Sequence, residues 1–326
     1  MSRAVVLCTG PMDPAGLALL EGQADVVAPA GPGADDLARA LPQADYLVVR
    51  TFLPADLLER EHRLRAIVRH GAGLDMIPMK SATAQGIPVA YVPGANAQAV
   101  AEYVVGSFFG LARRFGAADA ALRTAGWADS RLEAAQGLEL AGKTVGIVGV
   151  GAVGRRVAAM CGAGLGMTVL GYQPDPSRLP PGVTGVPLDE LLQRSDFVSV
   201  NCPLNNATRH LIDARRLSFM KRTAFLVNAA RGDVIDEQAL VAALQSRAIG
   251  GAALDVYHEQ PIRPAHPLLA LDNVLLTPHV AALTRESVAR MSIGSAQAIL
   301  QLMRGEQPDH LANPEVWAAW PHRAPT

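Results

Sequence analysis

The chain has 326 residues, of which 50% are hydrophobic and 18% are charged, a composition that indicates a globular protein with a large core and excludes a disordered chain. Its length fits two domains of ordinary size. The formal net charge is −1 and the basic residues form no long run, so no nucleic-acid partner is expected. No hydrophobic stretch approaches the roughly 18 residues of a transmembrane helix, so no membrane partner is expected.

The three cysteines are far apart in the sequence and none belongs to a CxxC motif. Neither a disulfide framework nor a metal site is expected, and each cysteine is predicted to be a small core residue. The apolar run at residues 4–8 is too short for the core of a secretory signal. These features favour a reducing cytoplasm. The cysteines are Cys8, Cys161 and Cys202.

Short apolar runs alternate with helical patterns twice along the chain, as in α/β proteins with parallel sheets covered on both faces. Two such series predict two doubly wound domains. The first series of predicted strands is 4–8, 26–28, 46–49, 66–69 and 89–92. The second is 145–149, 168–171, 197–201, 224–228, 252–256 and 274–277.

A helix-rich bridge joins the two series. Asn96 is a suitable N-cap for a helix that Gly116 is predicted to end. The last long helical pattern, at 285–303, follows the final predicted strand and is expected to return the chain to the first domain. The expected division is a discontinuous domain of residues 1–97 and 286–326 with an inserted domain of residues 98–285, and the two chain crossings suit a cleft that closes over a ligand.

The stretch TVGIVGVGAVGRRVA runs from a predicted strand into a predicted helix and contains the GxGxxG pattern of Gly149, Gly151 and Gly154. In dinucleotide-binding proteins the first glycine allows a tight turn, the second lets the backbone approach a pyrophosphate, and the third lets the helix pack on the strand. Glycine-rich turns without a ligand share this pattern. The strand before it and the helix after it favour the nucleotide site.

Several residues with suitable chemistry follow predicted strands, where open α/β sheets bind their ligands. Arg231 is either a bidentate clamp for a carboxylate or a member of a structural ion pair. His279 is either a proton carrier or an ordinary structural histidine. The segment Gly71–Ala72–Gly73 is either an anion-binding nest or a plain turn. Asp255 ends another strand, and together these positions indicate an active site.

At these positions the sequence resembles the D-isomer-specific 2-hydroxyacid dehydrogenases, the family that includes phosphoglycerate, glycerate and formate dehydrogenases. The resemblance extends over nearly the whole chain. It lies in HGAGLD ending at Asp75, NAQAVAEY around Glu102, Gly126–Trp127, NCPLNNATRHLID, LVNAARGDVIDEQAL, AALDVYHEQP and TPHVA.

The resemblance implies a flavodoxin-like substrate domain into which a Rossmann NAD(P)-binding domain is inserted. The implied reaction moves a hydride between nicotinamide and C2 of a small 2-hydroxy or 2-keto acid. Arg231 is implied to bind the substrate carboxylate, with the backbone of Ala72 and Gly73, and His279 to carry the proton. Asp255 is implied to hold the nicotinamide carboxamide, and the backbone of Ala152 and Val153 to contact the pyrophosphate. The implied cofactor-lining residues are Pro203, Thr208, Ala229 and Ala230, although Pro203 and Thr208 have the alternative of shaping a loop.

One departure from the family concerns the partner of His279. The family has Glu before the Pro of its DVFxxEP stretch, and here that position is Gln260. An amide orients an imidazole but adds no charge, so we expect a lower apparent pKa for reduction than in Glu-bearing relatives. Glu259 is an alternative partner, although adjacent side chains on an extended segment point opposite ways. Formate dehydrogenases also have Gln there, which leaves formate oxidation as an alternative reaction.

A second departure concerns the cofactor and the substrate. Gln173 occupies the usual place of the ribose-binding acid and tolerates NAD or NADP. Asp175 would repel a 2′-phosphate, which favours NAD, although Arg178 is close enough in the sequence to compensate. Arg50 follows a strand at the place where phosphoglycerate dehydrogenases have an Arg for the far anionic group of the substrate, which indicates a substrate with a phosphate or a second polar end. A short substrate of the hydroxypyruvate, glyoxylate or phosphoglycerate type fits best.

The resemblance implies a homodimer formed through residues 96–140, and Trp127 is compatible with such an interface.

The rival function is that of a non-catalytic, NAD-sensing protein of the co-repressor type. The retained Arg231 and His279 disfavour this function.

Overall fold

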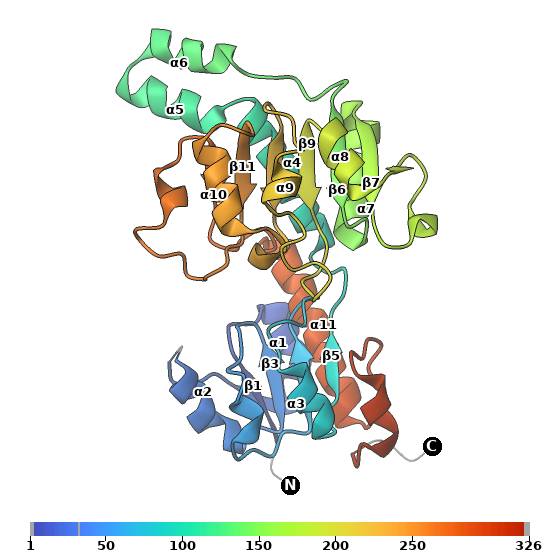
Figure 1. Ribbon diagram of the computed structural model, residues 1–326. Coiled ribbons are helices and arrows are strands. Elements are labelled where there is room, and N and C mark those ends of the chain that lie inside the picture. Colours follow the sequence, from blue (N-terminus) through green and yellow to red (C-terminus); the bar gives the residue numbers. More distant parts are fainter. Residues whose placement is uncertain (1–2, 32, 323–326) are drawn as a thin grey trace. The chain divides into compact units, whose positions relative to one another are not determined.

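The computed structural model describes residues 3–31 and 33–322. The chain forms two compact units (Figure 1). The terminal unit comprises Met1–Asn96 and Leu283–Thr326, and the central unit comprises Ala97–Ala282. Each unit contains one sheet, and both sheets are parallel, as the sequence predicted.

The sheet of the terminal unit has the strand order β2-β1-β3-β4-β5, which is the flavodoxin-like order. Alternate strand residues face two separate hydrophobic clusters: Leu7 and Leu47 belong to one, and Val6 and Tyr46 to the other. Because both faces of the sheet are covered, β1 and β3 are hydrophobic at every position. The strands are β1 Ala4–Cys8, β2 Ala24–Val27, β3 Tyr46–Val49, β4 Ala66–Arg69 and β5 Val89–Tyr91.

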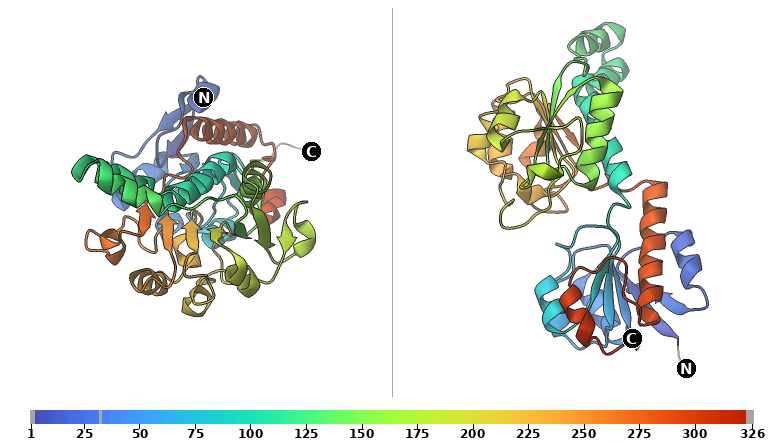
Figure 2. Two further views of the ribbon diagram at one scale, coloured as in Figure 1. Left: turned by 90° about the horizontal axis from the view of Figure 1, so that it is seen from above. Right: turned by 90° about the vertical axis from the view of Figure 1, so that its right-hand side faces the viewer.

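The helices of this unit are distributed between the two clusters. The cluster containing Leu7 includes Leu37 of α2 (Ala34–Ala40) and Ala82 of α3 (Met79–Ala84). The other cluster includes Leu20 of α1 (Pro14–Leu20) and Ile299 of α11 (Arg285–Met303). Helix α11 also packs against α1, so the last long helix does return the chain to this sheet (Figure 2).

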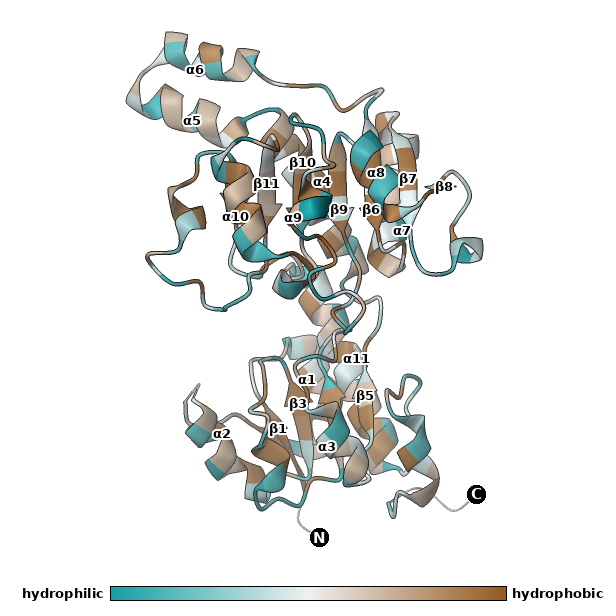
Figure 3. Ribbon diagram, in the orientation of Figure 1, coloured by the Kyte–Doolittle hydropathy of each residue, from teal (hydrophilic) through white to brown (hydrophobic). Residues whose placement is uncertain are grey.

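The sheet of the central unit has the strand order β12-β11-β10-β9-β6-β7-β8. Strands β7 and β8 are added on one side of β6, and the later strands, beginning with β9, are added on its other side. This is the Rossmann order with one added strand, and ligands of such sheets bind at the carboxyl ends of the strands near the point where the strand order reverses. Figure 3 shows the strands of both sheets as predominantly hydrophobic segments. The strands are β6 Thr144–Val148, β7 Thr168–Tyr172, β8 Thr184–Gly185, β9 Phe197–Val200, β10 Phe225–Asn228, β11 Gly251–Leu254 and β12 Val274–Leu276.

Helices of the central unit cover both faces of this sheet. Helix α4 buries Val104 and Phe108 in the cluster that also contains Ile147 of β6. Helices α8 and α10 contribute leucines to the cluster on the other face of the sheet. These helices are α4 Ala97–Ala112, α7 Ala152–Ala159, α8 Leu188–Arg194 and α10 Glu237–Gln245, and the short α9 is Ala214–Leu217.

The bridge after α4 differs from the prediction that Gly116 ends the helix. Helix α4 ends at Ala112, and Arg114 adopts the left-handed conformation with φ of 52°. Gly116 lies instead inside α5 (Phe115–Thr124), which packs against α6 (Trp127–Ala135). Arg114 adopts this turn although it is not glycine, and its guanidinium is paired with Glu133 of α6. The side-chain pairing across the hairpin is a tertiary feature that local glycine signals do not contain.

Candidate active site

The glycine-rich loop between β6 and α7 has the geometry of a dinucleotide site. Gly149 has φ of 95°, and a Cβ on it would lie 2.7 Å from the backbone nitrogen of Cys202, which follows β9. A Cβ on Gly154 would lie 2.3 Å from the carbonyl oxygen of Gly149. A Cβ on Gly151 meets no described atom within 4 Å. The first and third glycines are therefore required by the fold, whereas the second leaves open space beside the backbone.

Helix α7 begins immediately after this open space. Its first hydrogen bond runs from the N–H group of Arg155 to the carbonyl of Gly151. The N–H groups of Ala152 and Val153 therefore lie in the first turn, where backbone N–H groups have no intrahelical acceptor. Such N–H groups at a helix N-terminus bind phosphate. The open face at Gly151 and this helix start fit the pyrophosphate of NAD(P).

The end of β7 carries the residues expected beside the ribose. Gln173 donates from Nε2 to the carbonyl of Asp175 at 2.9 Å. The Asp175 carboxylate accepts from the hydroxyl and the backbone N–H of Ser177, at 2.6 and 3.1 Å, and these bonds lower the pKa of Asp175. Asp175 therefore stays anionic beside Gln173.

The turn after β10 holds Arg231 through a buried amide. Asn228 is 1% exposed, accepts from the N–H of Ala230 at 3.0 Å and donates to the carbonyl of Arg231 at 2.9 Å. Arg231 donates from Nη1 to the carbonyl of Ala230 at 2.7 Å. The role of Asn228 has one signal in the sequence, a polar residue at the end of an otherwise apolar strand.

Asp255 follows the neighbouring strand β11 and is completely buried. One carboxylate oxygen accepts from the Thr277 hydroxyl at 2.6 Å and from the N–H of Val280 at 2.7 Å. The other accepts from the N–H of Ala281 at 2.8 Å. Asp255 thus holds the loop that contains His279 from both sides, a structural task that the sequence did not suggest.

Two tyrosines complete the support of this loop. The Tyr103 hydroxyl from α4 lies 2.6 Å from the Thr277 hydroxyl, and the Tyr257 hydroxyl donates to the carbonyl of Thr277 at 2.9 Å. Burial raises the pKa of Tyr257 to about 12, so it remains a donor at neutral pH. Tyr103 is separated from Thr277 by more than half of the chain, and no local pattern indicates their contact.

His279 contacts the residue that replaces the family's glutamate. Its Nδ1 lies 2.8 Å from Oε1 of Gln260. Because an amide oxygen only accepts, Nδ1 carries the proton of this bond and Nε2 is the nitrogen that can exchange a proton with a ligand. Glu259 does not take this place, since its carboxylate pairs with Arg263 at 2.8 Å.

The loop containing Pro203 and Thr208 is organised by its own hydrogen bonds. The Thr208 hydroxyl donates to the carbonyl of Pro203 at 2.6 Å and accepts from the N–H of Asn205 at 2.8 Å. Thr208 and Pro203 therefore make the contacts expected of residues that shape a loop. Cofactor binding by Pro203 and Thr208 remains a prediction.

The remaining predicted residues belong to the terminal unit, at the carboxyl ends of β3 and β4. The backbone N–H of Arg50 donates to the Thr9 hydroxyl at 2.8 Å, and its guanidinium has no hydrogen bond or ion pair with the residues that the structure describes. Burial lowers the pKa of Arg50. Arg69 donates to the carbonyl of Gly73 at 2.8 Å and so fixes the turn that contains Ala72. Within residues 3–31 and 33–322, the N–H groups of Ala72 and Gly73 have no acceptor.

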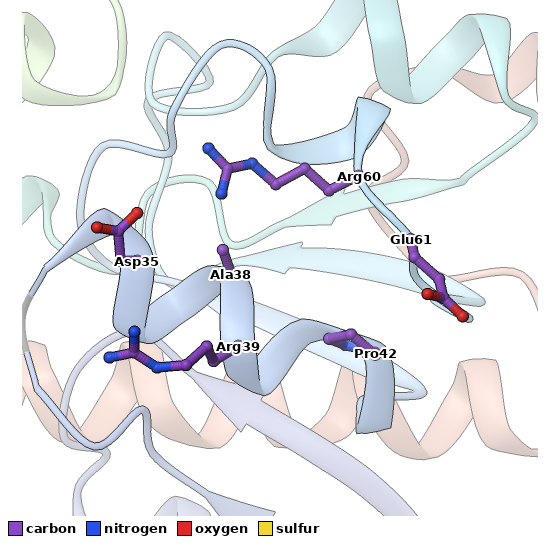
Figure 4. Close-up of a pocket in the computed structure, with 6 residues that line it drawn as sticks. All are labelled: Asp35, Ala38, Arg39, Pro42, Arg60 and Glu61. Carbon is purple, nitrogen blue, oxygen red and sulfur yellow. The ribbon is translucent and has the colours of Figure 1, made fainter.

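A shallow pocket elsewhere in the terminal unit does not contain these residues (Figure 4). Pro42 and Glu61 stand in the segments that lead into the amino ends of β3 and β4, whereas Arg50 follows the carboxyl end of β3. The two arginines of the pocket are paired with Asp36 and Asp56. The pocket is lined by Asp35, Ala38, Arg39, Pro42, Arg60 and Glu61.

Two further features are absent from the part of the chain that the structure describes. No group of three or more His, Cys, Asp or Glu side chains is placed to hold a metal ion there. None of the helices found in that part has the length and apolar character needed to span a membrane.

Comparisons with known proteins identify the family of this chain. Residues 105–281 match the model of the D-isomer specific 2-hydroxyacid dehydrogenase, NAD binding domain. A glyoxylate reductase of Thermofilum pendens is 37% identical, with 97% of this chain and 96% of that protein aligned. A D-3-phosphoglycerate dehydrogenase of Methanocaldococcus jannaschii is also 37% identical, over 94% of this chain but only 59% of its own length.

A solved structure extends the similarity to the fold. The NADPH-dependent glyoxylate/hydroxypyruvate reductase of Sinorhizobium meliloti, in complex with NADP and malonate, is 28% identical and has a TM-score of 0.86, with 100% of both chains covered. The family match covers more than half of this chain and includes the nucleotide loop and His279. The chain therefore belongs to the D-isomer specific 2-hydroxyacid dehydrogenases, a family of NAD(P)-dependent oxidoreductases.

Proposed function

We propose that this protein reduces a small 2-keto acid to the 2-hydroxy acid, and catalyses the reverse reaction, with His279 as the acid/base and Arg231 as the carboxylate-binding residue. The observation that carries the proposal is the bond between Nδ1 of His279 and Oε1 of Gln260, which orients the ring and assigns proton exchange with the substrate to the other ring nitrogen, Nε2. The loop of His279 is held by Asp255, which directly follows the strand next to the Arg231 turn. Bound NAD(P)H supplies the hydride that C2 of the substrate accepts.

Each protein group has a separate task in this proposal. Arg231 binds the carboxylate through two parallel hydrogen bonds and so orients the adjacent carbonyl. Protonated His279 donates from Nε2 to the carbonyl oxygen as negative charge develops on it, and keeps the proton on Nδ1. Gln260 fixes the orientation of the ring throughout. In oxidation the neutral Nε2 takes the proton back from the hydroxyl group.

We propose that the terminal unit is the substrate domain, 1–97 with 286–326, and that 98–285 is the NAD(P)-binding domain. The match of residues 105–281 to an NAD-binding model supports the second assignment. The Arg50 guanidinium and the N–H groups of Ala72 and Gly73 support substrate binding by the first, since all three have donors without an acceptor in the described part of the chain. The names of the relatives favour glyoxylate, hydroxypyruvate or a phosphoglycerate-type substrate.

We propose NAD rather than NADP as the preferred cofactor. The Asp175 carboxylate is held in its anionic form beside Gln173, where it would repel a 2′-phosphate. The Sinorhizobium relative uses NADPH, so the preference is a property to be tested on this chain itself. A reducing cytoplasm remains the prediction for its location, supported by three buried, free cysteines.

The test is a spectrophotometric assay of the purified protein with NADH and NADPH against glyoxylate, hydroxypyruvate, phosphohydroxypyruvate and longer 2-keto acids, with formate and NAD as an additional pair. Reduction of a 2-keto acid with NADH preferred is the expected result. Turnover of formate alone would assign the alternative reaction that Gln260 suggests. Binding of NAD without turnover of any member of the panel would assign the sensing role.

A further inference from the structure

The segment of residues 256–261 presents Gln260 to His279, and His258 in its middle is held by two acidic residues. The backbone N–H of His258 donates to the Glu237 carboxylate at 2.9 Å. Its Nδ1 donates to Oδ1 of Asp233 at 2.5 Å. Both acids follow the Arg231 turn closely: Asp233 lies in the short helix Gly232–Val234, and Glu237 is the first residue of α10.

The backbones of the two turns are also in direct contact. A Cβ on Gly232 would lie 2.1 Å from the carbonyl carbon of Tyr257 and 2.6 Å from the nitrogen of His258. Any side chain at position 232 would therefore separate the Arg231 turn from the 256–261 segment. The hydrogen bonds of His258 lie beside this contact and fix its register.

The charges around His258 favour the ionised form of both partners. Burial would raise the pKa of Asp233, but hydrogen bonds from His258 and Arg209 outweigh burial and lower it. The bond to Asp233 raises the pKa of His258, the Asp233 and Glu237 charges add to this effect, and Arg209 opposes it. His266 shares the Glu237 carboxylate at 3.1 Å. The side chain of Asp233 is 17% exposed and that of His258 is 65% exposed, so water screens the charges of this pair in part.

We propose that His258 is a positioning residue of the reaction: through Asp233 and Glu237 it fixes the 256–261 segment to the Arg231 turn and thereby fixes Gln260 on Nδ1 of His279. Asp233 is two residues after Arg231, and His258 is two residues before Gln260. One bond therefore joins the turn that binds the carboxylate to the segment that orients the acid/base. The kinetic part of this proposal rests on the proposed function, whereas the structural part does not.

A double-mutant cycle tests whether His258 acts through Gln260. His258→Ala is expected to lower kcat for keto-acid reduction about tenfold, with little change in KM because Asn228 holds the Arg231 turn independently. In a Gln260→Ala background the same substitution is expected to change kcat less than about twofold. His258→Asn retains an N–H donor for Asp233 and is expected to restore most of the activity. Arg263→Ala, which breaks an exposed ion pair in the neighbouring segment, is the matched control.

A second readout needs no turnover. The Nδ1–H proton of His279, detected by NMR of the wild-type protein, is expected to exchange with water faster in His258→Ala and as fast as in Gln260→Ala. Equal losses of kcat in both backgrounds, or an unchanged Nδ1–H signal in His258→Ala, would overturn the positioning role. An inactive wild type that shows the NMR effect would refute the proposed function and support the positioning role.

Discussion

His279 has a backbone φ of 57°, a left-handed conformation that a residue other than glycine keeps only where its surroundings enforce it. Asp255 enforces it here by accepting the N–H groups of Val280 and Ala281. The same loop is held on its other side by the Thr277 hydroxyl. The ring is oriented separately, by Gln260. Backbone and side chain of the proposed acid/base thus have independent supports.

The uncharged partner of His279 leads to a prediction about pH. Gln260→Glu places a carboxylate where the amide oxygen now accepts the Nδ1 proton, and a negative charge at that distance favours the imidazolium. Reduction requires the protonated form and falls as pH rises through the pKa of His279. The pH–rate profile of Gln260→Glu is expected to shift upward by about one pH unit or more.

Profiles of kcat against pH for wild type and Gln260→Glu measure this shift. Glu259→Gln is the matched control, because Glu259 pairs with Arg263 and not with His279. An unmoved profile in Gln260→Glu would show that the residue at position 260 does not set the protonation of the acid/base.

The sequence indicated the residues that we propose to react, but not the residues that support them. Arg231, His279 and Asp255 could be selected because each lies within three residues of the carboxyl end of a strand, where such folds bind ligands. Asn228, Thr277 and Tyr103 escaped selection because their roles depend on hydrogen bonds to residues that the chain brings together only on folding. Gln260 was predicted from the family pattern, and its contact with His279 is present.

At the scale of elements, the loop between β6 and α7 contains one glycine that the packing requires and another that lies beside open space. The Cβ of an alanine at position 154 would lie 2.3 Å from the Gly149 carbonyl, whereas at position 151 it would meet open space. Gly154→Ala is therefore expected to destabilise the protein by about 1–3 kcal/mol. Gly151→Val is expected to leave stability nearly unchanged and to weaken NADH binding about tenfold or more.

Thermal unfolding and fluorescence titration with NADH measure the two effects on the same preparations. The glycine pair serves as its own control, since each substitution adds a side chain to the same loop. Equal stability losses in both variants, or unchanged NADH affinity in Gly151→Val, would contradict the assignment of separate tasks to these glycines.

Most elements could be predicted because buried parallel strands are apolar at every position and alternate with helices. Strand β8 has two exposed residues, Thr184 and Gly185, and its place in the sheet comes from pairing with β7. No hydrophobic pattern marks such a strand. The wrong end assigned to α4 has a different cause, because Arg114 takes the left-handed turn that the prediction reserved for glycine.

At the scale of the whole molecule, the stability of the terminal unit is expected to depend on one buried histidine. His70 is 3% exposed, and its Nε2 lies 2.8 Å from the Ser292 hydroxyl of α11. Burial and the nearby charges of Arg50 and Arg69 lower its pKa from 6.5 to about 4. Between these values the unfolded chain binds a proton that the folded chain does not, so stability falls as pH decreases from about 6.5 to about 4.

The full effect of His70 is about 3 kcal/mol, which follows from the size of the pKa difference. Urea unfolding of wild type and His70→Gln across this pH range measures it, with the variant expected to lose less stability on acidification. His62→Gln, a change at a more exposed histidine of the same unit, is the matched control. The same pH dependence in wild type and His70→Gln would refute the role of His70.

A second prediction at this scale concerns assembly. Every residue of α5 and α6, all described, is at least partly exposed, and Trp127 and Leu132 are 71% and 67% exposed. Apolar side chains of this size on an outlying hairpin favour an interface, and we expect a homodimer through this region. Light scattering is expected to give a dimer for wild type and a monomer for the double variant Trp127→Glu, Leu132→Glu. The change Leu269→Glu, at an exposed leucine elsewhere in the central unit, is expected to leave the dimer intact, and a wild-type monomer would refute the expectation.

The two-unit division itself follows from the order of the segments along the chain. The pattern at residues 285–303 predicted that the last long helix would rejoin the first sheet, and α11 does pack against α1 there. The oligomeric state has no such signature in the sequence, because exposure of Trp127 is a property of the folded hairpin.

The proposed transfer of a proton by His279 during reduction of a 2-keto acid can be tested directly. The most direct measurement compares the rate of NADH consumption by wild type and His279→Ala on the best substrate of the panel, with NADH affinity determined for both. We predict that His279→Ala lowers kcat by about 100-fold or more while NADH affinity stays within about twofold. Equal turnover by the two proteins would contradict the proposed role of His279, because the hydride transfer would then proceed without its imidazole.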